Sequence, residues 1–465
     1  MSGGRAAADG SNAPVPQRCT IVLPTTGEFD SRTFRIASAL AARGHEVTVL
    51  ARLAPGLPAE ARDPAGYRIV RLPVSAADGL PLPAPIRRAV ARWRSGRRAA
   101  ATGAATTDAA ATDAAATGVA AAAPSRVASR GRLRRAVAAA VRIAAIALTV
   151  RSQARAARAV APPADVVHGM AYMGIPVALA VAAARGGRVV YDARDIYVDA
   201  NNLARLPGPA RRLLGRVERG WARRADRVMT VNRPYAEVMA DRFGVPLPAI
   251  VMNCSYRFDP GDPPVRRFHE ALGLAAGTRV VLYQGGLAPH RGIEQLVAAI
   301  GGVPDAVLVL LGYGPLAGEL ERIAADPAGP AAGRVRLLPA VPPAELLGWV
   351  AAADVVAMPI QPSTLNHRLT TPNKLFEAMA AGVPVVASDL PGMAAIVRET
   401  GCGRLVDPTD PAAIAAAIRA ILDAPPAERR ALRDRALAAA HGPYSWERQM
   451  GLLVEEYGRL TGRPW

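Results

Sequence analysis

Short apolar segments alternate with helical patterns along most of the chain. In the first part, an apolar segment at 19–23 is followed by a polar loop, a helical pattern over 31–43 and a second apolar segment at 47–50. These segments lack the polar alternation of a strand with one solvated face, so they predict a parallel sheet covered by helices. After an interruption the alternation predicts strands at 165–168, 188–191, 227–231 and 249–252, and helices near 175–185 and over 209–224.

A second series of the same kind begins after residue 264. The preceding stretch, 259–264, is rich in Pro and Gly, which is typical of a linker between domains. Helices at 292–300 and 316–325 separate the first of the predicted strands, which are 279–284, 306–311, 334–338, 354–358 and 383–387. The predicted fold class is therefore α/β, with two doubly wound, Rossmann-like domains in tandem.

The interruption in the first domain has an unusual composition. Residues 99–125 are almost wholly Ala, Thr, Asp and Gly, a low-complexity stretch with little to bury in a core. Residues 130–160 then predict a helix rich in Ala, Val and Arg. Such a helix suits a membrane surface, but its arginines fall on two sides, which makes this the weaker interpretation. The two groups are Arg132, Arg135 and Arg142, and, nearly opposite, Arg151, Arg155 and Arg158.

These breaks define the expected domains. We expect a disordered tail over 1–17 and an N-terminal domain over 18–262, with an insertion at about 95–160. A C-terminal domain follows over 263–442. The last segment, 443–465, predicts a helix after a Gly-Pro break, and we expect it to pack back on the N-terminal domain.

Charge and cysteine content narrow the functional classes. The formal net charge of +19 suggests anionic partners such as nucleotides, phospholipids or nucleic acid, although a general preference for arginine explains it equally well. Aromatic residues make up only 5% of the chain and no base-reading motif accompanies the arginines, which argues against nucleic acid. The three cysteines, Cys19, Cys254 and Cys402, are far apart, which is typical of a reducing compartment and gives no metal-site spacing.

No targeting or membrane-spanning segment is expected. Residues 1–17 have no apolar core like that of a signal peptide. No apolar run reaches the roughly 18 residues needed to span a bilayer. We therefore expect a cytoplasmic protein, and a peripheral contact with the inner face of the membrane stays open.

One lysine stands out. Lys374 is the single lysine among 57 basic residues. It lies in a predicted helix with Thr371 as N-cap, Pro372 as first helical residue and Gly382 as the end. A cation in the first turn is unfavourable at the positive end of the helix dipole, and a bound anion would remove that conflict.

Glu377 follows three residues later on the same face of this helix. A phosphate at the start of the helix would suit Lys374, and a ribose diol would suit Glu377. A surface Lys–Glu pair worth a few tenths of a kcal/mol explains the same residues without a ligand. The location at a strand–helix junction favours binding.

A second junction also carries basic residues. The segment after the strand at 279–284 contains Gly285, Gly286, His290 and Arg291 and leads into a helix. Ligands of doubly wound sheets bind at such junctions, beyond the carboxyl ends of the strands. The loop at 25–30 lacks the three-glycine fingerprint, and the chain has no Gly-Lys-Ser/Thr phosphate loop, which disfavours a dehydrogenase or a P-loop kinase.

Together these motifs resemble family 4 of the glycosyltransferases, a group with the GT-B fold of two Rossmann-like domains facing a central cleft. In the second domain the matching motifs are Tyr283-Gln284-Gly285, Arg291-Gly292, Leu311-Gly312-Tyr313-Gly314-Pro315, Ala353-Asp354-Val355, the helix at 374–382 and Pro384-Val385-Val386. The first domain matches more loosely, at 43–47, 190–195 and 225–228.

The resemblance implies roles for individual residues. Glu377 would hold the ribose hydroxyls of the donor, and Arg291 would contact its diphosphate. The chain also departs from the family. Gly286 stands where members often have arginine, Leu369 where many carry a glutamate, and Arg194 where similar members often show histidine.

The expected function is transfer of a sugar from a UDP- or GDP-linked donor to a hydroxyl acceptor, either a cell-envelope glycan or a lipid-linked saccharide. The resemblance implies retention of anomeric configuration, no metal and no cofactor. Arg291 and Lys374 are the expected catalytic residues. The expected donor-binding residues are Gly285, Gly286, His290, Arg291, Gly314, Thr371, Asn373, Lys374 and Glu377. Candidates on the acceptor side, which follow predicted strand ends in the N-terminal domain, are Gly27, His168, Arg194 and Asp195.

Two alternatives stay open. Leu369 and Gly286 are compatible with a non-catalytic protein that binds a sugar nucleotide or a glycan. A sugar-nucleotide epimerase of the same fold would need clustered acids and bases, which the sequence does not show.

Overall fold

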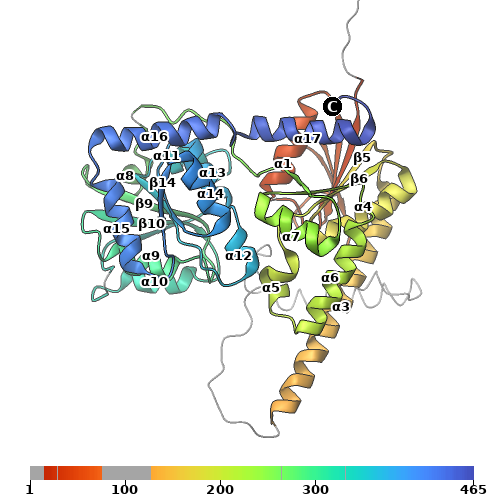
Figure 1. Cartoon of the computed structure of the whole chain (residues 1–465), viewed down its shortest axis with the longest axis horizontal. Helices are drawn as coiled ribbons and strands as arrows, with labels where there is room; N and C mark the ends of the chain where they lie inside the picture. Colours follow the sequence, from red (N-terminus) through yellow and green to blue (C-terminus); the bar gives the residue numbers. More distant parts are fainter. Residues whose placement is uncertain (1–14, 29, 76–126, 263, 330) are drawn as a thin grey trace, which may run out of the picture.

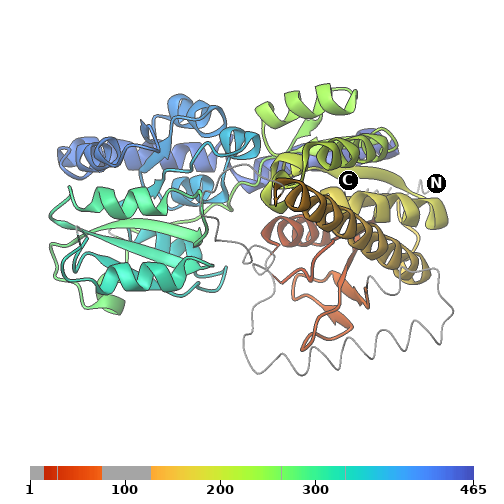
Figure 2. The same ribbon diagram turned by 90° about the horizontal axis from the view of Figure 1, so that it is seen from below.

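The computed structural model describes residues 15–28, 30–75, 127–262, 264–329 and 331–465. Residues 1–14 of the predicted tail and the whole low-complexity stretch at 99–125 lie outside these ranges. Two domains lie side by side, each with its own sheet, and the C-terminal helices bridge them (Figures 1 and 2). The predicted α/β class with two parallel-sheet domains is confirmed.

The N-terminal sheet has eight described strands in the order β3-β4-β2-β1-β5-β6-β7-β8, all parallel except the pairing of β3 with β4. The strands are β1 (Arg18–Val22), β2 (Glu46–Arg52), β3 (Glu60–Arg62), β4 (Arg68–Leu72), β5 (Val166–Met170), β6 (Arg188–Asp192), β7 (Arg227–Thr230) and β8 (Ala249–Ile250). The sequence did not predict β3 and β4, because arginines and a glutamate interrupt their apolar pattern. The edge strand is β3, and β4 lies next to it; Glu60, Arg62 and Arg68 are exposed there and Arg71 is half-buried.

Helices cover both faces of this sheet. On one face lie α3 (Val127–Val160), α4 (Ala171–Arg185), α6 (Gly208–Ala222) and α7 (Arg233–Phe243), whose apolar residues form one core with the strands. On the other face lie α1 (Ser31–Ala41) and α17 (Trp446–Thr461). The last predicted helix is thus α17, and its Trp446, Met450, Leu453 and Tyr457 are buried in the N-terminal core. The short α5 (Asn201–Ala204) precedes α6.

The C-terminal sheet is fully parallel, with the order β11-β10-β9-β12-β13-β14. Its strands are β9 (Arg279–Gly286), β10 (Ala306–Tyr313), β11 (Val335–Leu338), β12 (Val355–Met358), β13 (Val385–Ser388) and β14 (Gly403–Val406). The chain winds outward from β9 in one direction and from β12 in the other. In such a sheet, ligands bind where the winding reverses, beyond the carboxyl ends of the two central strands.

Helices of the C-terminal domain also form two layers. One layer holds α9 (Ile293–Ile300), α10 (Ala317–Ala325) and α15 (Pro411–Leu422). The other holds α8 (Arg267–Leu272), α11 (Leu346–Ala351), α13 (Asn373–Ala380), α14 (Pro391–Thr400) and α16 (Pro426–His441). The short α12 (Leu365–Leu369) lies just before α13 and faces the N-terminal domain (Figure 1).

A buried glutamate makes stability depend on pH. Glu218 of α6 is 4% exposed and accepts a hydrogen bond of 2.6 Å from the Tyr191 hydroxyl. Burial raises the pKa of this carboxyl to about 7. Since the folded-state pKa lies above the unfolded value, this group's contribution to stability is full below about pH 4 and is lost as the pH rises through 7.

We therefore expect the wild-type protein to lose about 2–4 kcal/mol of unfolding free energy between pH 4 and 8 through this residue. Glu218→Gln, which keeps an acceptor for Tyr191, should lack this part of the slope. Urea unfolding of both proteins across this pH range tests the prediction. Glu237→Gln on α7, whose side chain is 57% exposed, serves as control and should follow the wild type. Parallel slopes for the wild type and Glu218→Gln would contradict the prediction.

Candidate active site

A cleft of about 770 Å³ lies between the two domains. Its C-terminal wall is built from the loops after β9, β10 and β12 and from the start of α13, the place where the strand order reverses. The predicted residues that line it are Gly285, Gly286, Arg291, Gly314, Thr371, Asn373, Lys374 and Glu377 from this wall, and Arg194 and Asp195 from the N-terminal domain.

Glycines let the loops of this wall approach closely. Gly312 has φ +158°, and a Cβ there would lie 2.0 Å from the Gly285 carbonyl oxygen. Gly292, which caps α9 with φ +76°, would place a Cβ 1.8 Å from the Pro359 carbonyl oxygen. No side chain fits at either position, so the loops after β9, β10 and β12 pack together as one surface.

Lys374 lies in the first turn of α13, half-buried in the cleft. Its Nζ is 3.5 Å from the centre of the Tyr283 ring, within the range of a cation–π contact. Burial, together with the positive charge of Arg291, holds the pKa of Lys374 well below its usual value. Two basic groups thus face one space, in which an anion would favour the charged form of the lysine.

The predicted start of this helix is wrong by one residue. Pro372, with φ −72° and ψ 146°, is the N-cap, and α13 begins at Asn373. Thr371 does not cap the helix, because its Oγ1 accepts a hydrogen bond of 3.2 Å from Asn232 Nδ2 of the N-terminal domain. Thr371 still lines the cleft.

Glu377 faces the same space one turn later. Gln284 Nε2 donates a hydrogen bond to one oxygen of the Glu377 carboxylate, Oε2, at 3.4 Å. Burial raises the pKa of this carboxyl, and the positive charge of Arg35 is the strongest opposing influence. The Gln284 Oε1 atom is buried without a partner. These groups offer hydrogen bonds that a diol would complete.

His290 lies elsewhere. It has φ +65° and lines a separate depression together with Glu294 and Gln361. The expectation that His290 contacts the donor phosphates is therefore not supported. Its neighbour Arg291 does line the cleft.

Of the four acceptor-side candidates, Arg194 and Asp195 line the cleft, and Gly27 and His168 do not. Arg194 Nη1 donates to both carboxylate oxygens of Asp30, at 2.9 and 2.8 Å, and lines the cleft. Although burial opposes it, the Asp30 charge raises the pKa of Arg194. Asp195 also lines the cleft, and its Oδ1 accepts from Asn366 Nδ2 at 2.9 Å. Gly27 is not among the cleft residues, and its φ of +88° serves the turn after β1.

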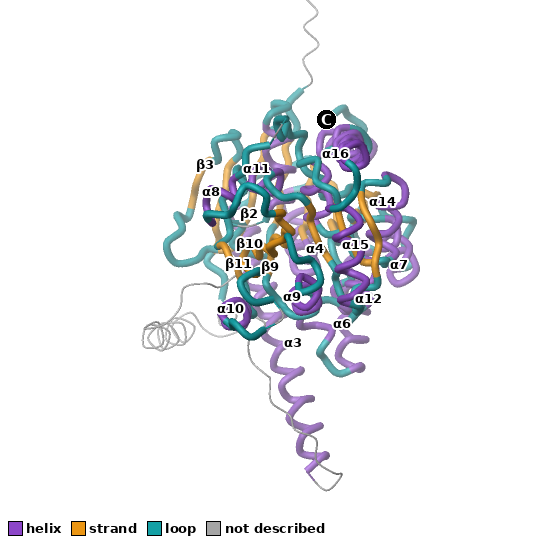
Figure 3. Tube along the Cα trace, turned by 90° about the vertical axis from the view of Figure 1, so that its left-hand side faces the viewer, coloured by secondary structure: helices purple, strands orange, loops and turns teal. Residues whose placement is uncertain are grey.

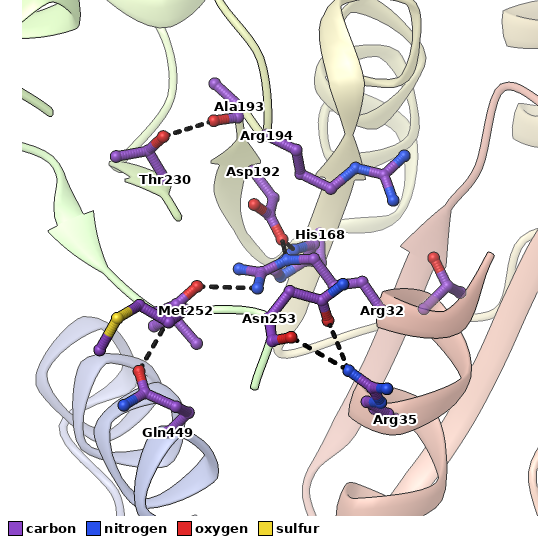
Figure 4. A network of polar contacts seen from close by, with 12 residues as sticks. Arg32, Arg35, His168, Asp192, Ala193, Arg194, Thr230, Met252, Asn253 and Gln449 are labelled. Atoms are coloured by element: carbon purple, nitrogen blue, oxygen red, sulfur yellow. Dashed lines mark hydrogen bonds and ion pairs between the residues drawn. The ribbon is translucent and has the colours of Figure 1, made fainter. Parts of the chain in front are cut away.

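His168, predicted on the acceptor side, does not line the cleft. It is fully buried in β5 and is hydrogen-bonded to the Tyr457 hydroxyl of α17 and to Asp192, at 3.1 Å from Asp192 Oδ2. In Figure 4 it lies next to Asp192 and Arg32. The strand extends to Met170, two residues beyond its predicted end at His168, and all five of its residues are buried, so His168 does not reach an open site. His168 is a core histidine with both ring nitrogens satisfied.

The structure adds residues that sequence analysis missed. Arg32 of α1 lines the cleft and forms a completely buried ion pair of 2.7 Å with Asp192. Arg35, one turn later, donates from Nη1 to the Asn253 carbonyl and side-chain oxygens, both at 3.2 Å (Figure 4). Nothing in the sequence distinguishes these two arginines from the many others.

Asparagines connect the two walls. Asn253 Nδ2 donates to Asn373 Oδ1 at 2.8 Å, and Asn232 Nδ2 donates to the Leu369 carbonyl at 2.8 Å. Asn366 Oδ1 accepts from the Ile196 backbone at 2.8 Å. These contacts hold α12 and the start of α13 against the N-terminal domain. Among the described residues, no group of three or more His, Cys, Asp or Glu could hold a metal ion.

Known proteins resemble this chain in both sequence and fold. Residues 278–424 match the family described as glycosyl transferases group 1. A D-inositol 3-phosphate glycosyltransferase from Xylanimonas cellulosilytica is 31% identical over 271 residues, which cover 56% of this chain and 62% of the relative. The chain spans about half the length of the curated relatives it matches, between 45% and 62% for three of them.

Among solved structures, the sucrose-phosphate synthase of Thermosynechococcus elongatus aligns with a TM-score of 0.67 and 20% identity, covering 96% of this chain and 99% of that one. The Anabaena protein HepE in complex with UDP-glucose aligns with a TM-score of 0.60 and 16% identity, over 95% of this chain and 100% of that one. These likenesses confirm the predicted GT-B fold.

Proposed function

We propose that this chain, whose residues 278–424 match the group 1 glycosyltransferases, transfers a sugar from a nucleotide-diphosphate sugar to a hydroxyl acceptor. The observation that carries this proposal is the convergence of Lys374, Arg291 and Glu377 on one cleft. Two cations suit the diphosphate, and the carboxylate one turn further suits the ribose diol. The structural relative HepE was solved with UDP-glucose, which supports a UDP-linked donor, and a GDP-linked donor is the alternative to be assayed.

The proposed reaction retains the anomeric configuration and needs no metal. The acceptor hydroxyl attacks the anomeric carbon from the side of the leaving group. The bond between that carbon and the diphosphate oxygen breaks, and a phosphate oxygen takes the hydroxyl proton. Lys374, Arg291 and the start of α13 stabilise the negative charge that develops on the departing diphosphate.

The proposed acceptor is a cell-envelope glycan or a lipid-linked saccharide that enters along the N-terminal wall. This wall presents Arg194 and Asp195 at the cleft, and both side chains are held in place by Asp30 and Asn366. Fixed polar groups orient an acceptor with little loss of freedom. The proposed location is the cytoplasm, with contact at the inner face of the membrane.

One observation favours a second candidate, a sugar-nucleotide-binding protein without turnover. Leu369 occupies the position where, by the resemblance to family 4, many members carry a glutamate, and its side chain packs against the N-terminal core. No carboxylate replaces it nearby in sequence. Incubation with UDP-, GDP- and dTDP-sugars and candidate acceptors separates the two: transfer or donor hydrolysis supports the transferase, and binding of nucleotide without either supports the alternative.

Glu377→Gln tests the donor site directly. We expect the KM for the donor to rise about 10–100-fold with a smaller change in kcat, because a hydrogen bond to a charged group contributes about 1.5–3 kcal/mol. Initial rates at varied donor concentration measure both constants. Glu321→Gln on the exposed side of α10 is the matched control and should behave like the wild type. An unchanged KM in Glu377→Gln would remove this residue from the donor site.

A further inference from the structure

The long helix α3 reaches well beyond the body of the N-terminal domain, on the side away from α17 (Figures 1 and 3). Its second half is anchored: Ala157 is fully buried, and Gln153 Nε2 donates to the Leu23 carbonyl at 2.8 Å. Further toward its start, Val137 and Val141 are 54% and 64% exposed. The helix therefore carries exposed apolar residues on the part that projects from a fixed base, between that base and its arginine-rich first turns.

This apolar character exceeds what sequence analysis expected. Residues Ala136–Val160 are long and apolar enough to cross a membrane, with mean hydropathy 1.3, yet only 22% of the apolar window is buried. A core helix of similar composition would be mostly buried. The exposed apolar surface of α3 is thus unexplained by packing within the described chain.

Exposure also changes the interpretation of its arginines. Val137, Val141 and Ala144 are exposed and follow one another at spacings of four and three residues. The same spacing continues through the half-buried Leu148 to three further exposed residues, Arg151, Arg155 and Arg158. All of them lie on one stripe of the helix. Arg142, which seemed to spoil a polar face, is half-buried on the opposite side.

The length of the apolar stretch determines whether it can span a bilayer. Residues 136–150 contain one charged side chain, and as a helix they extend about 22 Å. A bilayer core is about 30 Å thick, so this stretch is too short to span it. An apolar stripe that ends in three arginines instead matches the boundary between acyl chains and anionic headgroups.

We propose that the exposed stripe of α3 docks the protein on an anionic membrane surface. Val137, Val141 and Ala144 enter the interface, and Arg151, Arg155 and Arg158 contact lipid phosphates. The inference deepens the proposed function, because a lipid-linked acceptor would be met at that surface. Its test does not depend on catalysis.

The test is co-sedimentation of the full chain with vesicles of phosphatidylcholine alone or mixed with phosphatidylglycerol. We expect binding to the mixed vesicles and a decrease with added salt. The triple variant Arg151→Gln, Arg155→Gln, Arg158→Gln should lower the partition coefficient about 100-fold. The double variant Val137→Asp, Val141→Asp should bring binding to the level seen with phosphatidylcholine alone.

Matched controls carry the same changes elsewhere. These are the triple variant Arg398→Gln, Arg419→Gln, Arg430→Gln on exposed positions of the C-terminal domain, and Leu213→Asp on α6, where the leucine is 48% exposed. Both should bind like the wild type. Circular dichroism and thermal unfolding of every variant verify that each is folded.

Three results would overturn the proposal: no wild-type binding to either vesicle, equal binding by the wild type and both α3 variants, or a second copy of the chain covering the stripe. The last would appear in light scattering without lipid as a wild-type dimer that the valine variants dissociate. Donor hydrolysis by the same preparations reports on the proposed function separately, since neither α3 variant touches the cleft.

Discussion

Lys374→Ala is expected to lower kcat about 10²–10³-fold, the usual effect of removing one preorganised group that stabilises developing charge. The residue lines the cleft at the start of α13, with its Nζ 3.5 Å from the centre of the Tyr283 ring. The alanine variant leaves the diphosphate with Arg291 as the remaining cation of this wall. Steady-state kinetics with saturating donor measure the loss.

Arg419→Ala on the exposed face of α15 is the control for charge alone and should retain full turnover. Normal kcat in Lys374→Ala would refute the assignment of this lysine to the leaving group.

The pH dependence gives an independent check on the same residue. Burial and Arg291 lower the pKa of Lys374, so the charged form is lost at a lower pH than for an ordinary lysine. In the free enzyme, kcat/KM for the donor should therefore fall as the pH rises through that lowered value. Lys374→Arg should shift this alkaline limb upward, because a guanidinium stays protonated. A limb at the same pH in both proteins would assign it to another group.

Asp192→Ala is expected to destabilise the protein by about 3–5 kcal/mol, because it leaves the Arg32 guanidinium buried without a counter-charge. Both side chains are completely buried, and Asp192 also bonds His168, whose other ring nitrogen meets Tyr457 of α17. Urea unfolding followed by circular dichroism measures the change. Although burial opposes it, Arg32 and His168 hold the pKa of Asp192 well below its usual range. Its contribution is thus present above about pH 4 and is lost as the pH falls further.

Two comparisons separate the ion pair from a general effect of substitution. Asp389→Ala breaks an exposed pair with Arg398, and we expect a change below about 1 kcal/mol. The double variant Arg32→Met, Asp192→Leu removes both charges and should recover most of the stability lost in Asp192→Ala. If Asp192→Ala were no more destabilising than Asp389→Ala, the buried pair would not hold this core together.

Local patterns were sufficient for most of the architecture. The period of the apolar residues predicts many of the long helices and buried strands, because backbone geometry alone decides which residues share a face. It did not predict β4, β14, α7, α15 or α16. The strand ends then predict the junctions at which Arg291 and Lys374 lie. Where local rules compete, the prediction fails by a small amount: α13 begins after Pro372, because Thr371 bonds the opposite domain instead.

The sequence by itself determined two α/β domains and the C-terminal wall of the cleft, since the residues of that wall follow directly from consecutive strand–helix junctions. Only the tertiary structure decided the opposite wall. His168 lies in a strand whose residues are all buried, and its pattern does not tell which helix layer it meets. Arg32 and Arg35 gain their roles from Asp192 and Asn253, which lie far away in the chain. Such pairings depend on how two layers pack, and a local period carries no information about the partner on the other side.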